Sequence, residues 1–458
     1  MHKRIIKFLK LSDVRLKWND VFLLLLPVAI WFSYHPVISL GANSHMNFEL
    51  SLTEIFLVLF AVTALPRIWR NRSSVLRNKA VWLVGVFVLW NTLSLAWTQD
   101  FLRGLLTTGL LWLLALTFCA VLSNKNLKKL LSALFKLLII SAVVMSVFAW
   151  LQVIVGTLSG TSEFLLCSGC VASQFGFARA TGFAIEPQFF GNLLLVPILV
   201  LCYLKFKKPK SELKLNTLIT FLTTTLFLTL SRGAIYAFAI GLLILLILHF
   251  KQLKKVLCTA SLVLGGFIIA LILQGVLAQI NPNFHETFVG ATTKTIHQLS
   301  LGIIDLRPPE SISMIGETPA YNGYIEESTD IRLAFSQVAI STWSSSIPNV
   351  IIGTGIGSSG VAMNATHPDQ SDAKEIVQNE FLEILLELGM IGLVIFITIV
   401  VSLFCDTHQH KWPWAILTAF LVQWFFFSGY PNALHIYLTL LMLFVINNAF
   451  RPKILSTS

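Results

Sequence analysis

Charged residues are scarce in this chain of 458 residues: Lys, Arg, Asp and Glu together make up 12% of it. A soluble globular domain carries roughly 25% charged residues. Hydrophobic residues reach 55%, which excludes a disordered chain, because disorder needs low hydrophobicity and high charge. The same balance argues against a soluble enzyme, since a chain this apolar needs lipid as its solvent.

Cysteine and histidine are also sparse. Six Cys in 458 residues are too few for a disulfide-built fold. Cys167 and Cys170 form one CxxC pair, which an oxidising compartment could close into a local disulfide without a catalytic role. The His residues are scattered, with no HExxH and no second CxxC. The sequence therefore predicts neither a metal site nor a cofactor.

Long apolar runs recur along the chain, each near the ~20 residues that cross a ~30 Å bilayer core. The first run follows a basic start, and we favour a retained helix over a cleaved signal peptide because the run is long and lacks a clear cleavage site. The fold class predicted is an all-α polytopic membrane protein. Its twelve spans lie near 20–40, 51–66, 80–97, 104–122, 130–156, 188–204, 215–230, 234–250, 256–277, 380–404, 413–429 and 434–450.

The basic residues fall mainly on one side of these spans. With the N-terminus inside, the inner segments hold 25 of the 33 Lys and Arg residues, Lys136 low in the fifth span makes 26, and the outer side holds 7. This positive-inside bias predicts a protein of the cytoplasmic (inner) membrane with both termini cytoplasmic. It also explains the net charge of +11 without nucleic acid as a partner.

The predicted spans divide the chain into four segments. These are N-terminal transmembrane helices (1–156), central transmembrane helices with Arg-bearing outer loops (157–277), a large outer loop (278–379) and C-terminal transmembrane helices (380–458). The outer loop far exceeds the ~4–6 residues of an ordinary connection. Within it, residues 329–347 have apolar side chains at helical spacing. They predict an amphipathic helix, capped by Thr329 or Asp330, on the outer membrane face or on the ends of the spans.

Three outer arginines stand on separate segments. Arg179 lies in RATGFAIEPQFFGN before the sixth span, Arg232 in TLSRGAIYA between two spans, and Arg332 in the amphipathic helix. Each has a plain structural interpretation: a headgroup contact for Arg232, an ion pair with Glu186 for Arg179, and a solvated helix face for Arg332. Arginine at membrane depth is nevertheless a functional-site candidate by default. Three guanidinium groups converging on one anion would bind phosphate oxygens in planar bidentate forks.

Two further patterns follow in the outer loop and at the start of the tenth span. The turn GTGIGSSG (353–360) allows close backbone approach to an anion, although an ordinary flexible turn is the simpler interpretation and the GK[ST] of an ATP-binding loop is missing. In QNEFLEILLELGMIGL (378–393), Glu380, Glu383 and Glu387 share one helical face. Such a patch is most often a solvated helix end, and the alternative is that it binds sugar hydroxyls or shapes a pocket.

Together, TLSRGAIYA and QNEFLEILLELGMIGL resemble the signature of the O-antigen ligase and O-antigen polymerase family of bacterial polysaccharide membrane proteins. The first is similar to the family's Ser-Arg-Gly junction, and the second to its Asn-x-x-Leu…Glu-x-Gly-x-x-Gly motif at the start of a span. The order of motifs also matches, over about 175–395. The resemblance implies a metal-independent, GT-C-like membrane glycosyltransferase without a cofactor. Such an enzyme transfers glycan from an undecaprenyl-diphosphate carrier on the outer face of the cytoplasmic membrane.

In members of this family, outer arginines engage the diphosphate, a role that carries over to Arg179, Arg232 and Arg332. Positive charge is what the departing diphosphate requires, so Arg332 also counts as a catalytic candidate.

The general base is a separate question, because many members carry His immediately before the Asn. Gln378 stands in that place here and cannot act as a base. His367, eleven residues upstream, and Glu186 are the candidates. Neighbouring arginines would lower the pKa of Glu186, which suits it to positioning the acceptor rather than deprotonating it.

The acceptor is another lipid-linked glycan in a polymerase and a lipid core in a ligase. We favour a polymerase, because of Gln378 and the Glu-Pro pair at 186–187. The partners implied are an undecaprenyl-diphosphate-linked oligosaccharide, the acceptor glycan or lipid, membrane lipids and, for a polymerase, a chain-length regulator protein.

Three other classes of protein fit the sequence less well. A secondary transporter of twelve helices is the main alternative, but it predicts charges inside the spans and an internal repeat, which this sequence lacks. A metal-dependent lipid-sugar transferase needs an Asp-x-Asp pair in the first outer loop, 41–50, where none occurs. A pure scaffold leaves the outer arginines unexplained.

Overall fold

The computed structural model describes most of the chain, and two compact units make it up. The described residues are 16–42, 47–159, 173–174, 177–184, 186–207, 212–281, 287–300, 304, 306, 320–406, 412–430 and 433–450. Unit 1 comprises Met1–Ile139, Phe335–Leu417 and Phe427–Ser458, and unit 2 comprises Ile140–Ala334 and Thr418–Phe426. The four segments expected from the sequence, which follow the predicted spans and the outer loop, stay a prediction.

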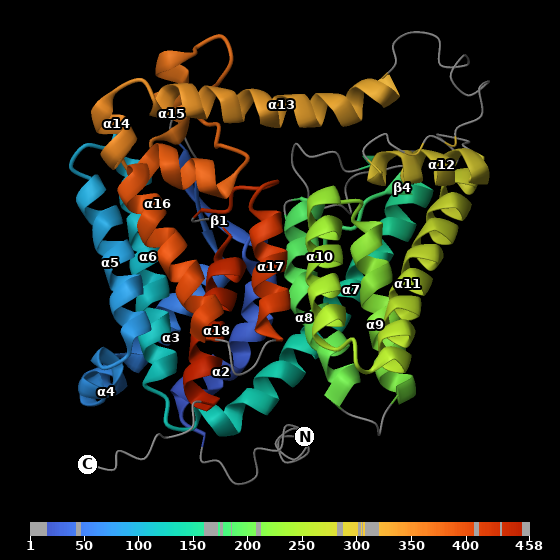
Figure 1. Cartoon of the computed structure of the whole chain (residues 1–458), viewed down its shortest axis with the longest axis horizontal. Helices are drawn as coiled ribbons and strands as arrows, with labels where there is room; N and C mark the ends of the chain where they lie inside the picture. Colours follow the sequence, from blue (N-terminus) through green and yellow to red (C-terminus); the bar gives the residue numbers. More distant parts are fainter. Residues whose placement is uncertain are drawn as a thin grey trace. The chain divides into compact units, whose positions relative to one another are not determined.

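Unit 1 holds the N-terminal and C-terminal helices. Among them, α3 packs against α2 and α6, and α5 packs against α6 and α16 (Figure 1). Its elements are α2 (Trp18–Ala29), η1 (Ile30–Phe32), β1 (Val37–Ala42), β2 (Asn47–Ser51), α3 (Leu52–Arg70), α4 (Arg72–Leu76), α5 (Lys79–Ser94), α6 (Phe101–Leu122), the start of α7 (Leu127–Ser159), the end of α13 (Ala320–Trp343), α14 (Ile347–Ile352), α15 (Ser359–Thr366), α16 (Glu380–Asp406), the start of α17 (Pro413–Gln423) and α18 (Leu434–Phe450).

Unit 2 is built around α8, which packs against α9 and α10, while α11 packs against α9 and α12. The apolar window of α8 is 78% buried, so this helix forms the core of the unit and fixes the position of the residues that precede it. Besides the remaining parts of α7, α13 and α17, the elements of unit 2 are β3 (Ser173–Gln174), β4 (Phe177–Ala178), α8 (Pro187–Lys207), α9 (Glu212–Leu228), α10 (Arg232–Leu248), α11 (Leu253–Ile280) and α12 (Phe288–Leu299).

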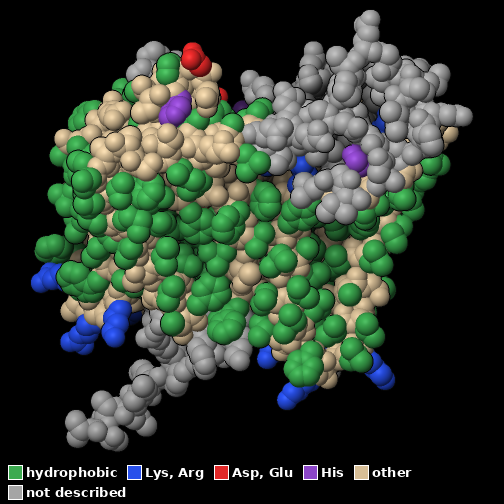
Figure 2. Space-filling model, turned by 45° about the horizontal axis from the view of Figure 1, so that its top comes forward, with side chains coloured by type: hydrophobic (Ala, Val, Ile, Leu, Met, Phe, Trp, Pro, Cys, Tyr) green, Lys and Arg blue, Asp and Glu red, His purple; other side chains and the backbone are tan. Residues whose placement is uncertain are grey.

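The apolar helices confirm a multi-pass membrane protein. Among the described residues, six helices are long and apolar enough to cross a membrane, namely α3, α6, α7, α8, α11 and α16. Shorter apolar helices of 10–17 residues occupy the other six predicted spans, so the count of twelve spans stays a prediction. Figure 2 shows hydrophobic side chains covering the visible flank, with Lys and Arg gathered along its lower rim. The last turns of α3 and α8 carry such basic residues, at the ends that the sequence predicts to be inside.

Two sequence predictions need correction. The first span, expected over 20–40, ends at Phe32, and residues after it form an antiparallel hairpin in which Val37 of β1 pairs with Ser51 of β2. Pro36 explains the end, because proline cannot donate the backbone hydrogen bond that a helix needs. The amphipathic helix is α13, which begins at Ala320, so Thr329 and Asp330 lie inside it and do not cap it.

The apolar face expected for α13 is buried only in part. Val338, Ala339 and Thr342 are buried, whereas Ile331 is exposed. In unit 1, Val338 and Ala339 pack with Met363, Val377 and Leu386, so this part of α13 is held over α15 and α16.

The backbones of the glycine turn 353–360 and of helix α16 approach each other closely at two glycines. Gly353 and Gly389 have φ values of 75° and 66°, and ψ values near ±180° that side-chain-bearing residues scarcely adopt. A Cβ on Gly389 would lie 2.3 Å from the Ile351 carbonyl oxygen, and one on Gly353 would lie 2.4 Å from the Glu387 oxygen. The turn is buried, and its Gly355 N–H donates to the Glu387 carbonyl at 2.9 Å. The two sequence patterns therefore form one structural feature.

This crossing predicts a large stability effect at one glycine. Gly389→Ala should destabilise the protein by about 2 kcal/mol or more, because it combines backbone strain with a collision against a carbonyl oxygen. Gly85→Ala is the matched control in unit 1, since a Cβ there meets nothing within 4 Å. Thermal unfolding in detergent checks the prediction, and equal midpoints for the two variants would contradict it.

Candidate functional site

The corner between α9 and α10 is the foundation of the candidate site in unit 2. It comprises Thr229, Leu230 and Ser231, and Leu230 has a φ of 47°, an unfavourable left-handed conformation for a residue with a side chain. Arg179 holds this corner: its Nε donates to the Thr229 carbonyl at 2.9 Å and its Nη2 to the Leu230 carbonyl at 3.3 Å. A cation that binds the last carbonyls of a helix also complements the helix dipole. Arg179 therefore fixes the backbone from which Arg232 starts α10.

The segment that carries Arg179 is itself held by α7. Gln152 forms two hydrogen bonds with the backbone of Gly182. Its Nε2 donates to the Gly182 carbonyl at 2.9 Å, and its Oε1 accepts from the Gly182 N–H at 2.8 Å. Ala180 N–H adds a bond to the Leu228 carbonyl at 3.1 Å. The segment that leads to Glu186 is thus tied to two helices of unit 2.

Glu186 lies immediately before α8, and its side chain is exposed. Desolvation by nearby protein atoms raises the pKa of Glu186 above its ordinary value of 4.5, against the lowering effect of Arg179 and Arg332. The sequence-based expectation of a lowered pKa is therefore wrong in direction. A raised pKa makes this carboxyl a stronger base once it is deprotonated.

Arg332 of α13 reaches the start of α8. Its Nη2 donates to Gln188 Oε1 at 3.4 Å, and Gln188 Nε2 donates in turn to the Phe426 carbonyl at 3.1 Å. Arg332 is half-buried, so it is not a freely solvated helix residue. Arg332 and Arg179 both act electrostatically on Glu186, so the three side chains lie within electrostatic range of one another.

Arg232 is the first residue of α10 and is also half-buried. One turn later, Tyr236 interacts electrostatically with Arg232 and donates its hydroxyl to the Leu299 carbonyl at 2.5 Å. Unit 2 therefore groups Arg179, Glu186 and Arg332, and it places Arg232 beside the corner that Arg179 holds. Their roles in binding and catalysis stay predictions.

The other candidate base lies in unit 1. His367 follows α15 and is half-buried, with Nδ1 2.9 Å from the Thr366 hydroxyl and Nε2 3.4 Å from the Ser341 hydroxyl. Gln378, which occupies the position of the family's histidine, is half-buried in the same unit. Cys167 and Cys170, singled out in the sequence, lie outside the described residues.

The three carboxylates of α16 are buried, so the interpretation as a solvated helix end is wrong. Glu380, Glu383 and Glu387 have exposed fractions of 0%, 1% and 2%. Glu380 accepts hydrogen bonds from the N–H groups of Gly429 at 2.6 Å and Tyr430 at 3.1 Å, and from the Tyr437 hydroxyl.

The other two carboxylates of α16 form hydrogen bonds with the segments that precede this helix. Glu383 accepts from Ser359 Oγ at 2.7 Å and from the Val377 N–H at 2.6 Å, and Glu387 accepts from the Ser359 N–H at 3.2 Å. Arg103 of α6 interacts electrostatically with both carboxylates. Asn379 caps α16, since its Oδ1 accepts from the N–H groups of the next turn at 3.0 and 3.1 Å. The motif that begins α16 therefore builds the fold of unit 1.

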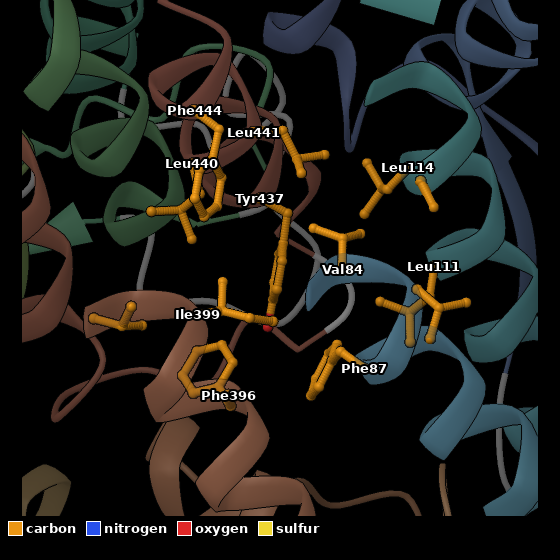
Figure 3. Close-up of a pocket in the computed structure, with 13 residues that line it drawn as sticks. Val84, Phe87, Leu111, Leu114, Phe396, Ile399, Tyr437, Leu440, Leu441 and Phe444 are labelled. Carbon is orange, nitrogen blue, oxygen red and sulfur yellow. The ribbon is translucent and has the colours of Figure 1, made fainter. Parts of the chain in front are cut away.

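An apolar pocket also lies in unit 1, between α5, α6, α16 and α18 (Figure 3). Tyr437 stands in it beside Phe396 and Ile399, and the hydroxyl of Tyr437 is bonded to Glu380. The remaining lining is hydrocarbon, which suits lipid chains rather than glycan chemistry. Within the described ranges, no group of three or more His, Cys, Asp or Glu side chains is arranged to hold a metal ion.

Comparison with known proteins gives one family. Residues 217–397 match the family model described as O-antigen ligase. The match starts in α9 and ends in α16, so it includes Arg232, Arg332 and His367 but not Arg179 or Glu186. No curated protein matches the chain.

The raised pKa of Glu186 predicts how stability depends on pH. For an acid whose pKa is raised by folding, the stabilising contribution is complete below the unfolded value of 4.5 and is lost as pH rises through the folded pKa. Glu186→Gln, which stays neutral, should therefore raise the unfolding midpoint at about pH 7 and leave it unchanged near pH 4. Asp369→Asn, at an exposed position, controls for the loss of one negative charge. A lower midpoint for Glu186→Gln at neutral pH would show instead that attraction to the arginines dominates.

Proposed function

Because the chain belongs to the O-antigen ligase family through residues 217–397, we propose that it transfers glycan from an undecaprenyl-diphosphate carrier on the outer face of the cytoplasmic membrane. Family membership itself indicates a membrane enzyme of glycan transfer with a lipid-linked glycan as substrate. The proposal adds a GT-C-like, metal-independent reaction and cytoplasmic termini. Polymerisation of lipid-linked units, with a chain-length regulator as partner, is the favoured activity, and transfer to a lipid core by a ligase is the alternative.

The grouping of Arg179 and Arg332 around Glu186, with Arg232 beside the corner that Arg179 holds, is the observation that carries this proposal. Departure of a diphosphate leaves negative charge on its oxygens, and guanidinium groups stabilise that charge through planar, charge-assisted hydrogen bonds. Arg232 and Arg332 are the proposed diphosphate ligands. Arg179 holds the carbonyls of the α9–α10 corner, so it supports the site chiefly by positioning Arg232 and by adding positive charge.

Glu186 is the proposed general base. The acceptor hydroxyl oxygen forms a bond to the anomeric carbon, the bond from that carbon to the diphosphate oxygen breaks, and the hydroxyl proton passes to the Glu186 carboxylate. The direction of its pKa shift supports this role, because a base works best with a pKa closer to the working pH. His367 remains the alternative base.

Two sequence features favour polymerase activity over ligase activity. Gln378 replaces the histidine that many members carry, and Glu186 stands directly before Pro187 at the start of α8. A secondary transporter, the alternative from another class, would move its substrate without forming a covalent product. The transporter hypothesis assigns no function to the motifs that resemble those of the family.

The diphosphate role predicts that lysine cannot replace these arginines. Arg232→Lys and Arg332→Lys should each lower glycan transfer at least a hundredfold while the protein stays in the membrane, because a lysine gives one point contact in place of a fork. Gel profiles of surface and lipid-linked glycans measure the effect. Arg72→Lys is the control, because Arg72 lies over the Trp69 ring in unit 1. Near wild-type profiles for Arg232→Lys and Arg332→Lys would remove the diphosphate role.

The same profiles separate the activities. In a polymerase, loss of activity leaves single repeat units in place of long chains. In a ligase, long chains accumulate on the lipid carrier and never reach their final acceptor. Profiles that do not change even when the whole chain is absent would end the glycan interpretation and lead to transport assays.

The assignment of the base predicts unequal losses. Glu186→Gln should lower the turnover number about a hundredfold, the usual contribution of a general base, whereas His367→Ala should have a mild effect. Steady-state kinetics on purified protein, with expression level as the control, measures both. The reverse ranking would move the role to His367, and two mild effects would remove base catalysis from the reaction.

A further inference from the structure

Two amide side chains of unit 2 are buried beside the arginine cluster. Asn192 on α8 and Gln423 at the end of α17 both have an exposed fraction of 0%. In each of them, neither the amide nitrogen nor the amide oxygen has a hydrogen-bond partner in the described part of the chain. Burying an amide without partners is costly, so such groups in a native protein need an explanation.

The position of Asn192 follows from its helix. Residues four apart on a helix lie on one face, so Asn192 shares a face of α8 with Gln188 and lies one turn further along. Gln188 contacts both Arg332 and the Phe426 carbonyl. At the same level, α8 approaches α10 closely, because a Cβ on Gly191 would lie 2.6 Å from the Ala234 Cβ.

Gln423 lies against the beginning of α10. A Cβ on Gly233 would stand 3.3 Å from Gln423 Nε2, 3.4 Å from its Oε1 and 3.0 Å from the Phe426 Cβ. Gly233 directly follows Arg232, so the Gln423 amide is adjacent to the helix turn that carries this arginine. Both amides therefore belong to one seam, formed by the starts of α8 and α10 and the end of α17 in unit 2.

The chemistry of the seam differs from that of the cluster above it. An amide offers two donors and a carbonyl acceptor without net charge, which matches sugar hydroxyl and acetamido groups. Phosphate oxygens are bound better by guanidinium groups. Asn192 is five residues beyond the start of α8, or about 7.5 Å along the helix axis.

We propose that Asn192 and Gln423 form a subsite for the sugar attached directly to the diphosphate, with Arg232 and Arg332 on the phosphates. The amides would donate to and accept from the hydroxyl or acetamido groups of that sugar, and so determine which first sugar the enzyme accepts. The inference rests on the proposed function, because it places the sugar next to the diphosphate ligands.

Two probes separate the sugar subsite from the diphosphate site. They are undecaprenyl diphosphate and undecaprenyl diphosphate that carries one N-acetylglucosamine, and each is titrated against the full-length protein in nanodiscs. The variants are Asn192→Leu and Gln423→Met, which keep the shape of the side chain and remove its polar atoms. Gln274→Met on α11 is the matched control, since Gln274 is also buried with an amide nitrogen that lacks a partner.

The wild type and Gln274→Met should bind the sugar-bearing probe at least tenfold more tightly than the bare carrier. Asn192→Leu and Gln423→Met should lose this preference, bind the bare carrier as the wild type does, and unfold at the same or a higher temperature, because they remove unsatisfied polar groups. By contrast, Arg232→Lys should weaken the binding of both probes.

Four results would overturn the sugar subsite. Variants that keep the preference would show that the amides do not contact the sugar, and a lower unfolding temperature of the free variants would show that the amides serve the fold. A wild type that binds both probes equally removes the subsite but leaves the diphosphate site intact. A wild type that binds neither probe removes the diphosphate site as well, and the proposed function with it.

Discussion

Backbone hydrogen bonding at broken helices is the constraint on which this structure depends. A chain solvated by lipid has no water at its buried helix ends, so the free N–H and C=O groups there need side-chain partners. Charged side chains act as these partners: cations donate to the carbonyls, and carboxylates accept from the N–H groups. Arg179 donates to carbonyls where α9 ends, and Glu380 and Glu383 accept from backbone N–H groups beside α16. These three charged residues therefore serve the backbone.

This constraint makes the outer arginines unequal. Arg179 stabilises a corner that contains the left-handed Leu230, and the strain at that corner is offset by the two carbonyl contacts it receives. Arg232 emerges from the corner, and Arg332 arrives from α13, a segment distant in sequence, through Gln188. Gln152 holds the segment that carries Arg179, Arg179 holds the corner, and the corner fixes the position of Arg232. The proposed anion site thus rests on rigid elements rather than on a loop alone.

Sequence alone predicted the positions of the apolar helices well, because a run of some 20 apolar residues is a strong local signal. It failed over 33–40, where Pro36 ends the helix and a hairpin follows. It also misjudged Glu380 and Glu383, because their partners, at 429–437 and at 359 and 377, are distant in sequence or hidden in a loop. The arginines were predicted from the sequence because guanidinium groups bind phosphate oxygens, and their positions relative to one another came from the structure. Asn192 and Gln423 escaped notice, since a single amide in an apolar run gives no sign of what surrounds it.

We propose that guanidinium groups of unit 2 recognise a diphosphate. The most direct test is the dissociation constant of the purified protein for undecaprenyl diphosphate and for undecaprenyl monophosphate, measured in nanodiscs with excess EDTA. The diphosphate should bind at least tenfold more tightly, and the double variant Arg232→Lys/Arg332→Lys should lose this difference. Equal affinity of the wild type for both lipids, or a preference that appears only after Mg²⁺ is added, would contradict it.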